Sequence, residues 1–240
     1  MNSTNKPQSV NESGTGSLTF QYGPLLSTSW GQGVGYNDLA PNNGCSNYSN
    51  GRTPTGCVAT AMSQIMKYYQ YPSNYNWTQM YDGSGSNETA RLMLDAGNSV
   101  GMDWGCSGSS AETSSVPNAL KSTFGYSAAD YMDFSIATTK SELNAGYPVI
   151  LRGGEKATKW LIFNVYENGH AWICDGIRQY SVPVRVSAGL HGYITVFHNA
   201  WTYHMNWGWS GMYNGWYSAS WQVGSDTFTY KAGMVYNIRK

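Results

Sequence analysis

The stretch TGCVATAMSQIMKYYQYP, residues 55–72, decides the fold. Apolar side chains recur in it at three- and four-residue spacing, which predicts an amphipathic helix beginning at Gly56 or Cys57. Pro72 ends this helix, because a proline ring disfavours the helical conformation of the residue before it. The apolar side chains expected on one face are Val58, Ala61, Met62, Ile65, Met66 and Tyr69.

Helical patterns dominate the first half of the chain, and strand patterns dominate the part after about Phe134. Two further helices are expected over residues 89–99 and near 116–124. A helix-rich half followed by a strand-rich half predicts the α+β class, with a site in the cleft between the halves. The expected strands are residues 147–151, 160–166, 170–177, 193–198 and 203–207.

The N-terminal 17 residues are polar and have almost nothing to bury, so residues 1–17 are expected to form a disordered leader. They lack the basic start and apolar core of a signal peptide. Residues 18–240 are expected to form one domain, mainly helical over 18–133 and mainly β over 134–240. Within it, residues 18–54 are rich in Gly, Asn and Pro and predict surface loops.

The composition excludes some classes of function. Charged residues make up 12% of the chain and their charges cancel, so the electrostatic signature of a nucleic-acid-binding protein is absent. The sequence contains no apolar run close to the roughly 18 residues that span a membrane. The abundance of Tyr, Trp and Asn favours an extracellular or envelope protein.

The chain has four cysteines, Cys45, Cys57, Cys106 and Cys174. An even number in a secreted protein allows three full disulfide connectivities, but their spacing does not indicate a disulfide framework. The sequence has no CxxC pair, and its histidines are not spaced with cysteines as zinc ligands are, so no metal site is expected. This leaves buried thiols or one reactive thiol.

Cys57 lies at the first turn of the predicted helix, where unpaired backbone N–H groups and the helix dipole favour negative charge. Such a position lowers the pKa of a thiol, and the thiolate is the nucleophilic form. An ordinary buried thiol on the packing face of the helix is an equally good interpretation of this position.

His170 begins a short apolar strand in the stretch NGHAWICDG, residues 168–176. Alternation places His170, Trp172 and Cys174 on one face of this strand. Asp175 falls on the other face, ~16 Å along the strand, and is therefore a poor partner for the imidazole. A His at the end of a strand can project into a cleft and act as a base.

A partner for His170 is available in YHMNWGWSG, residues 203–211. The side-chain carbonyl of Asn206 can accept the imidazole N–H, and Trp207 can shield that hydrogen bond from water. Taken alone, however, this stretch is read more simply as a Trp- and Gly-rich β-turn.

These motifs, in this order, resemble the streptopain family of papain-like bacterial cysteine peptidases. The stretches at 24–26, 30–32 and 102–110 are also similar to that family, so the resemblance covers most of residues 18–240. It implies a papain-like fold of two subdomains with the active-site cleft between them. It also implies a secreted cysteine endopeptidase that acts through a Cys57 thiolate, a His170 imidazolium and an acyl-enzyme.

The resemblance assigns further roles residue by residue. Gln32 would join the Cys57 backbone N–H in an oxyanion hole, while Asn206 and Trp207 would orient and cover His170. Ser110 and Gly169 would line the substrate groove through backbone contacts. The implied partners are protein or peptide substrates and an inhibitory prodomain, with no cofactor, and the short leader predicts the mature form.

Two features depart from the family pattern. Ser210 stands where the family has Gly, and an insertion at about residues 178–200, which adds His191 and His198, is expected to reshape one wall of the cleft. Two alternatives remain open. Ten Trp and nineteen Tyr would suit a glycan-binding module on a peptidase-like fold, and the same acyl-transfer groups would suit an amidase or transferase acting on cell-wall peptides.

Overall fold

The computed structural model describes residues 16–159, 163–189, 192–218, 221–223 and 226–240. The predicted leader lies outside these residues as far as position 15. Within the described parts, no helix combines the length and apolar character needed to cross a bilayer. The helices are α1 (Cys57–Tyr69), η1 (Trp77–Gln79), α2 (Asn87–Ser99), η2 (Thr113–Ser115), α3 (Val116–Ser122) and α4 (Ile136–Asn144).

Seven strands form one antiparallel sheet in the order β2-β9-β3-β4-β5-β6, with β1 paired to β4 beside this path. Strands β7 and β8 pair separately. Helices with an antiparallel sheet confirm the α+β class at this level. The strands are β1 (Ser17–Tyr22), β2 (Ala128–Asp133), β3 (Val149–Lys159), β4 (Phe163–Ser187), β5 (Tyr193–Asn206), β6 (Gly215–Tyr217), β7 (Gln222–Val223), β8 (Asp226–Thr227) and β9 (Tyr230–Arg239).

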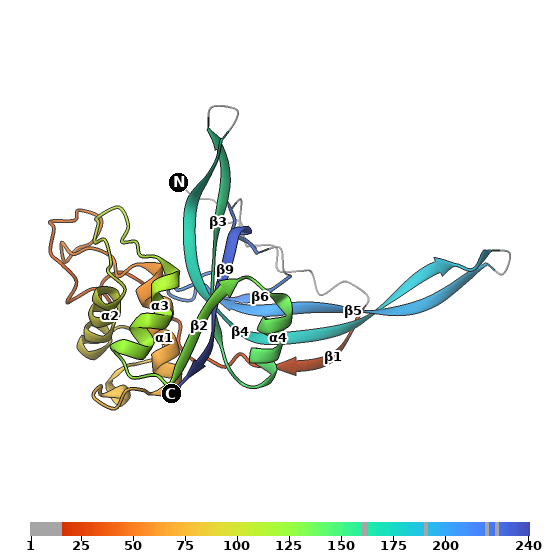
Figure 1. Cartoon of the computed structure of the whole chain (residues 1–240), viewed down its shortest axis with the longest axis horizontal. Coiled ribbons are helices and arrows are strands. Elements are labelled where there is room, and N and C mark those ends of the chain that lie inside the picture. Colours follow the sequence, from red (N-terminus) through yellow and green to blue (C-terminus); the bar gives the residue numbers. More distant parts are fainter. Residues whose placement is uncertain (1–15, 160–162, 190–191, 219–220, 224–225) are drawn as a thin grey trace.

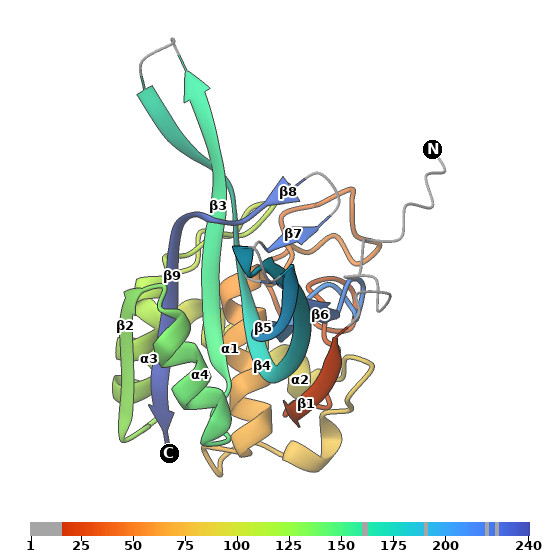
Figure 2. The same ribbon diagram turned by 90° about the vertical axis from the view of Figure 1, so that its right-hand side faces the viewer.

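The sheet separates two apolar cores, and alternation along β4 sends neighbouring side chains into different ones. Ala171 and Ile173 face the core that contains α1, α2 and α3. Trp172 and Cys174 face the core that contains Leu143 of α4. Figure 2 shows α4 in front of the sheet and α1 behind it. The sheet therefore holds His170 at the start of a segment that is covered on both faces.

Strands β4 and β5 are much longer than expected, because each joins two predicted strands into one. Their outer parts pair from Ser187↔Tyr193 inward and form a ribbon that extends away from the body of the molecule (Figure 1). The insertion at 178–200 builds this ribbon, and Ile194 and Phe197 on it are exposed. His191 lies outside the described residues.

Some elements differ from the sequence-based expectations. The predicted loop segment over residues 18–54 begins instead with β1. Its side chains are exposed, so β1 is held by backbone pairing with an edge of β4 rather than by burial. Strand β2 lies in the part predicted as mainly helical, and α4 in the part predicted as mainly β. The Ser135 hydroxyl caps α4 by accepting a hydrogen bond from the Thr138 N–H.

Cys45 and Cys106 form a disulfide, with their Cα atoms 5.1 Å apart. The expectation that these cysteines are thiols is therefore wrong, because loops that are distant in sequence meet in the fold. The disulfide joins the loop before α1 to the segment that follows α2. Cys57 and Cys174 remain as thiols.

Candidate active site

The N-terminus of α1 is fixed by a close approach of two backbone segments. Gly56, just before the helix, has a φ of 81°, and a Cβ there would lie 2.8 Å from the Ser109 carbonyl oxygen. Only glycine suits both constraints. The Ser109 hydroxyl donates to the Pro54 carbonyl oxygen at 2.6 Å. These contacts hold Cys57, the first residue of α1, against the segment around Ser109.

Cys57 and His170 open into the same cavity, which has a volume of about 450 Å³. One side comes from α1 and the segment after α2, and the other side comes from β3 and β4. Ser110 and Gly169, which are expected to line a substrate groove, both line this cavity. The full lining is Cys57, Val58, Gly101, Ser109, Ser110, Ala111, Glu112, Thr113, Arg152, Gly169, His170 and Ala171.

The His170 ring is oriented by a backbone carbonyl. Its Nε2 lies 2.8 Å from the Trp207 carbonyl oxygen. Because a carbonyl only accepts, Nε2 carries the proton in the neutral ring, and Nδ1 is left with a lone pair. This tautomer is the one in which Nδ1 can act as a base.

Aromatic rings surround the His170 imidazole. The Trp209 ring stacks on it at a centroid distance of 4.5 Å, and Trp207 and Trp172 lie parallel to it at 6.0 and 6.1 Å. Burial among these rings lowers the pKa of His170 to about 4, although the hydrogen bond to Trp207 acts in the opposite direction. Trp209 has the closest of these rings. The stretch at residues 203–211 includes Trp209, but its contact with His170 does not follow from the sequence.

Burial also raises the pKa of the Cys57 thiol. The backbone N–H groups of Ala171, Val58 and Cys57 act in the opposite direction and lower this pKa. The first two come from β4 and from the helix N-terminus, so the sulfur sits where these elements meet. Burial therefore opposes the thiolate–imidazolium pair that the resemblance implies, and the three N–H groups are the contacts that favour it.

Asn206 does not have the predicted contact with His170. Within the described residues no hydrogen bond joins the two side chains, because the Asn206 amide is directed elsewhere. It donates to the Thr28 carbonyl oxygen at 2.7 Å and to Gln64 Oε1 at 3.1 Å, and it accepts from the Gly208 N–H at 3.2 Å. Asn206 thus anchors the end of β5, and the next carbonyl, that of Trp207, contacts the imidazole.

The Gln32 backbone contacts the segment just before α1, since its carbonyl oxygen accepts a hydrogen bond from the Thr55 N–H at 3.0 Å. Ser210 approaches the same loop, and its N–H donates to the Trp30 carbonyl oxygen at 3.2 Å. A Cβ at Gly31 would collide with the Ser210 hydroxyl. Gln32 is not among the described residues that line the cavity.

Two other expectations about the site change. The Ser110 N–H and carbonyl both bond to the backbone of Asp103, so its N–H is not available to a substrate. The insertion at 178–200, which could reshape one wall of the cleft, supplies none of the described residues that line the cavity. Strand β4 carries it away from His170, at ~3.3 Å per residue.

Asp175 is not a partner of His170, as the strand-face argument predicts. Its buried carboxylate lies 2.6 Å from Nδ1 of His204, and its second oxygen accepts from the Leu26 N–H at 3.0 Å. This pair ties the segment after β1 to β4 and β5. Asp175 and His204 therefore have a structural role, and neither side chain lines the cavity.

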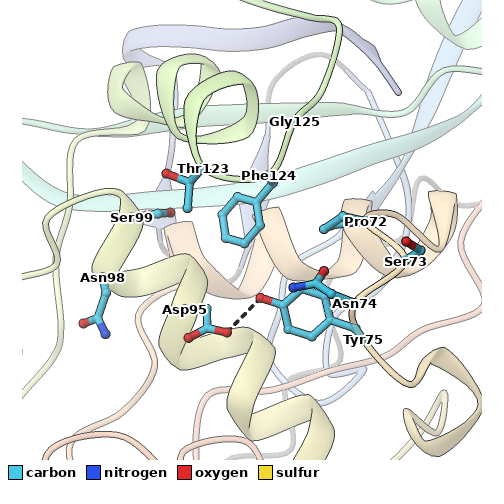
Figure 3. A pocket seen from close by; sticks show the side chains of 10 residues that line it. All are labelled: Pro72, Ser73, Asn74, Tyr75, Asp95, Asn98, Ser99, Thr123, Phe124 and Gly125. Carbon is cyan, nitrogen blue, oxygen red and sulfur yellow. Dashed lines mark hydrogen bonds between the residues drawn. The ribbon is translucent and has the colours of Figure 1, made fainter.

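A larger hollow of about 760 Å³ lies elsewhere, between α2 and the segments around residues 72–75 and 123–125. In Figure 3 the Tyr75 hydroxyl and Asp95 face each other across one side of it. Neither Cys57 nor His170 lines this hollow, so the smaller cavity is the candidate site. Among the described residues, no cluster of His, Cys, Asp or Glu side chains is suited to hold a metal ion.

Comparisons with known proteins show which proteins this chain is similar to. A model of the Peptidase C10 family matches residues 30–217. Streptopain of Streptococcus pyogenes is 30% identical over 238 residues, covering 78% of this chain and 52% of streptopain. A thiol protease/hemagglutinin, PrtT, of Porphyromonas gingivalis is 28% identical, covering 80% of this chain and 22% of PrtT. The chain therefore spans about half the length of streptopain.

Solved structures are also similar to this chain. Active wild-type interpain A, a cysteine protease of Prevotella intermedia, is similar with a TM-score of 0.69 and 26% identity, covering 92% of this chain and 96% of interpain A. A prointerpain A fragment from the same organism has a TM-score of 0.64 at 26% identity, covering 92% of this chain and 73% of the fragment.

Proposed function

The chain belongs to the Peptidase C10 family, and from this premise we propose that it is a cysteine endopeptidase with Cys57 as nucleophile and His170 as general base. The observation that carries the proposal is the shared cavity, into which the thiol and the imidazole both open. The hydrogen bond from His170 Nε2 to the Trp207 carbonyl supports it, because it leaves Nδ1 able to accept a proton.

The proposed reaction begins when the Cys57 sulfur attacks the carbonyl carbon of a peptide bond and its proton passes to His170 Nδ1. The Cys57 backbone N–H and the Gln32 side chain stabilise the tetrahedral oxyanion. The C–N bond then breaks, and the imidazolium gives its proton to the leaving amine. Water hydrolyses the resulting thioester, with His170 again as base, and restores the thiol.

The buried surroundings are compatible with this proton transfer. Moving a proton from sulfur to imidazole creates two opposite charges in one step, and their attraction offsets part of the desolvation cost that each charge would meet alone. The N–H groups on the sulfur and the Trp207 carbonyl on Nε2 stabilise the charged forms. Asn206 and Trp207 act here as positioning residues.

The papain-like layout is also part of the proposal. The helical part and the sheet part would be two subdomains, with the active-site cleft between them. In support, the cavity takes Cys57 and residues 109–113 from the first part, and Arg152 and residues 169–171 from the second. A peptide lying in this cleft would pass Ser110 on one side and Gly169 on the other.

We propose proteins or peptides as substrates, a secreted or envelope location, and regulation by a prodomain. The Cys45–Cys106 disulfide supports the location, because disulfides persist in oxidising compartments outside the cytosol. The similarity to a prointerpain A fragment supports the prodomain.

Substitution of the nucleophile tests the function. Cys57→Ala should fold, as judged by circular dichroism and thermal unfolding, and should lose hydrolysis of casein. The matched control is His198→Ala, which changes an exposed side chain on the ribbon and should leave turnover intact. Hydrolysis by a well-folded Cys57→Ala protein would contradict the assignment.

Alkylation tests the reactivity of Cys57 separately. Brief treatment with iodoacetamide at pH ~5.5, where an ordinary thiol is almost wholly protonated, should label Cys57 selectively, because transfer of its proton to His170 forms the thiolate in spite of the burial that raises the pKa of the thiol. Cys174 should lag, because burial raises its pKa well above the usual range, and the disulfide protects Cys45 and Cys106. Mass spectrometry identifies the labelled residue, and His170→Ala should slow the labelling. Labelling of Cys174 as fast as Cys57 would argue against an activated nucleophile.

A further inference from the structure

Gln64 is a buried polar residue of α1 that has no part so far in the proposed reaction. It lies seven residues after Cys57, which is close to two helical turns, so the two side chains leave the helix on the same side. Its side chain is fully buried. A buried amide needs hydrogen-bond partners, and those of the Gln64 oxygen lie outside the helix.

One atom, Gln64 Oε1, accepts three hydrogen bonds. Thr28 Oγ1 donates at 2.9 Å, the Trp30 N–H at 3.2 Å and the Asn206 amide at 3.1 Å. A backbone N–H can only donate, so the contact with Trp30 requires the oxygen of the Gln64 amide, and not its nitrogen, at this position. The Asn206 amide is fixed in the same way, because its nitrogen also donates to the Thr28 carbonyl oxygen at 2.7 Å.

These hydrogen bonds join three parts of the proposed catalytic machinery. Gln64 lies on the helix that carries the nucleophile. Trp30 belongs to the segment that leads to Gln32, and Asn206 directly precedes Trp207, whose carbonyl oxygen contacts the imidazole. A shift of the Asn206 side chain would turn the peptide that follows it, and the imidazole would turn with that peptide.

We propose that Gln64 is a positioning residue that holds the His170 imidazole in place for proton transfer from the Cys57 thiol. It fixes Asn206, and through Asn206 it fixes the direction of the Trp207 carbonyl. This inference rests on the proposed peptidase function. Gln64 is not among the described residues that line the cavity, so its substitution should change the chemical step and not the binding of substrate.

Kinetics of Gln64 variants test this role. Gln64→Met fills the space but has no comparable acceptor, so kcat should fall roughly 10- to 100-fold while KM changes little, because a misplacement of about 1 Å can cost a rate factor of this size. Gln64→Glu keeps an acceptor oxygen in either protonation state and should restore most of kcat. Gln64→Asn, whose shorter side chain withdraws the oxygen, replaces Gln64→Met if that protein does not fold.

A core substitution away from the site is the matched control. Leu92 of α2 is fully buried in the core that packs against α1. Leu92→Ala should lower the unfolding temperature at least as much as Gln64→Met does, but it should leave kcat unchanged. An equal fall in kcat would show that lost stability alone slows the enzyme, and it would overturn the proposal. A folded Gln64→Glu protein as slow as Gln64→Met would overturn it too.

The tautomer of His170 gives a readout that needs no cleavage. In the Cys57→Ala protein at neutral pH, the NMR chemical shifts of the ring nitrogens should show the proton on Nε2. Loss of this signal in His170→Ala identifies the residue. Adding Gln64→Met should give a mixture of the two tautomers, and Gln64→Glu in its place should give the single form again.

The NMR measurement separates this inference from the proposed function. If the wild type cleaved no peptide, the peptidase proposal would fail, and the spectra would still decide whether Gln64 positions the imidazole. An unchanged single tautomer in the Gln64→Met protein would overturn the role of Gln64.

Discussion

The inner and outer parts of strands β4 and β5 belong to one antiparallel ladder but have very different surroundings. In the inner part, Ile173 pairs with Asn206 and Cys174 pairs with Met205, and all four side chains are buried. In the outer part, Ile194 is 53% exposed and Phe197 is 69% exposed. The predicted strands cover the inner part and residues 193–198 of the outer part. Only the packed helices and aromatic rings turn the inner part into a rigid support for His170.

The largest expected difference between the two parts is chemical. His170→Ala in the inner part should lower kcat by about 10²–10⁴, because it removes the proposed general base. His198→Ala in the outer part should leave kcat unchanged. Steady-state hydrolysis of one fluorogenic peptide measures both. Comparable losses in the two variants would show that the ribbon takes part in catalysis.

Core packing should give the next largest difference. Ile173 is fully buried, so Ile173→Ala should lower the free energy of unfolding by about 2–5 kcal/mol. Ile194→Ala should change it by less than about 0.5 kcal/mol, as expected for an exposed site. Urea unfolding followed by fluorescence measures both values. A large loss from Ile194→Ala would mean that something covers the ribbon in solution.

A smaller difference is expected for two asparagines on β5. Asn206→Ala removes the buried hydrogen bonds from the Asn206 amide to the Thr28 carbonyl oxygen and to Gln64 Oε1, at a cost of about 1–3 kcal/mol in stability. It should also lower kcat/KM without abolishing activity, because the Trp207 carbonyl loses its anchor. Asn199→Ala, at an exposed site of the outer part, should do neither. Loss of activity with unchanged stability would indicate direct contact with His170.

The smallest effect should follow removal of the ribbon. Replacing residues 182–198 with a two-residue Asn-Gly turn keeps the pairing of Ser181 with Asn199 and of β1 with β4. Casein hydrolysis and the unfolding midpoint should both remain close to those of the full chain. A clear fall in either would connect the ribbon to the active site or to the core.

Much of the fold could be predicted because its patterns are local. The spacing in residues 55–72 predicts α1 to within a few residues, and the family assignment from the motifs is confirmed. The missed elements lack such patterns. Helix α4 has few apolar residues, although Ser135 is a capping signal that could have indicated it. Strand β1 depends on pairing with β4, and the disulfide depends on the meeting of distant loops.

At the candidate site, residue types indicate which chemical groups are present but not which atoms contact each other. The motifs identify Cys57 and His170, and the structure places both in one cavity. They also suggest Asn206 as the partner of the imidazole, because its side chain has the right chemistry. Which atom reaches Nε2 depends on the path of β5 after its last paired residue, and there the Trp207 carbonyl is presented. Backbone atoms carry no signature in the sequence.

The Cys45–Cys106 disulfide sets a limit on how the protein can be handled. A reductant that keeps Cys57 in the thiol form also attacks this disulfide, which fastens the segment leading to Ser110 and Glu112 to the loop before α1. Cleaving it would loosen one wall of the cavity. Activity should therefore rise at low concentrations of dithiothreitol and decline at high ones, so the optimal dose protects the nucleophile without opening the wall beside it.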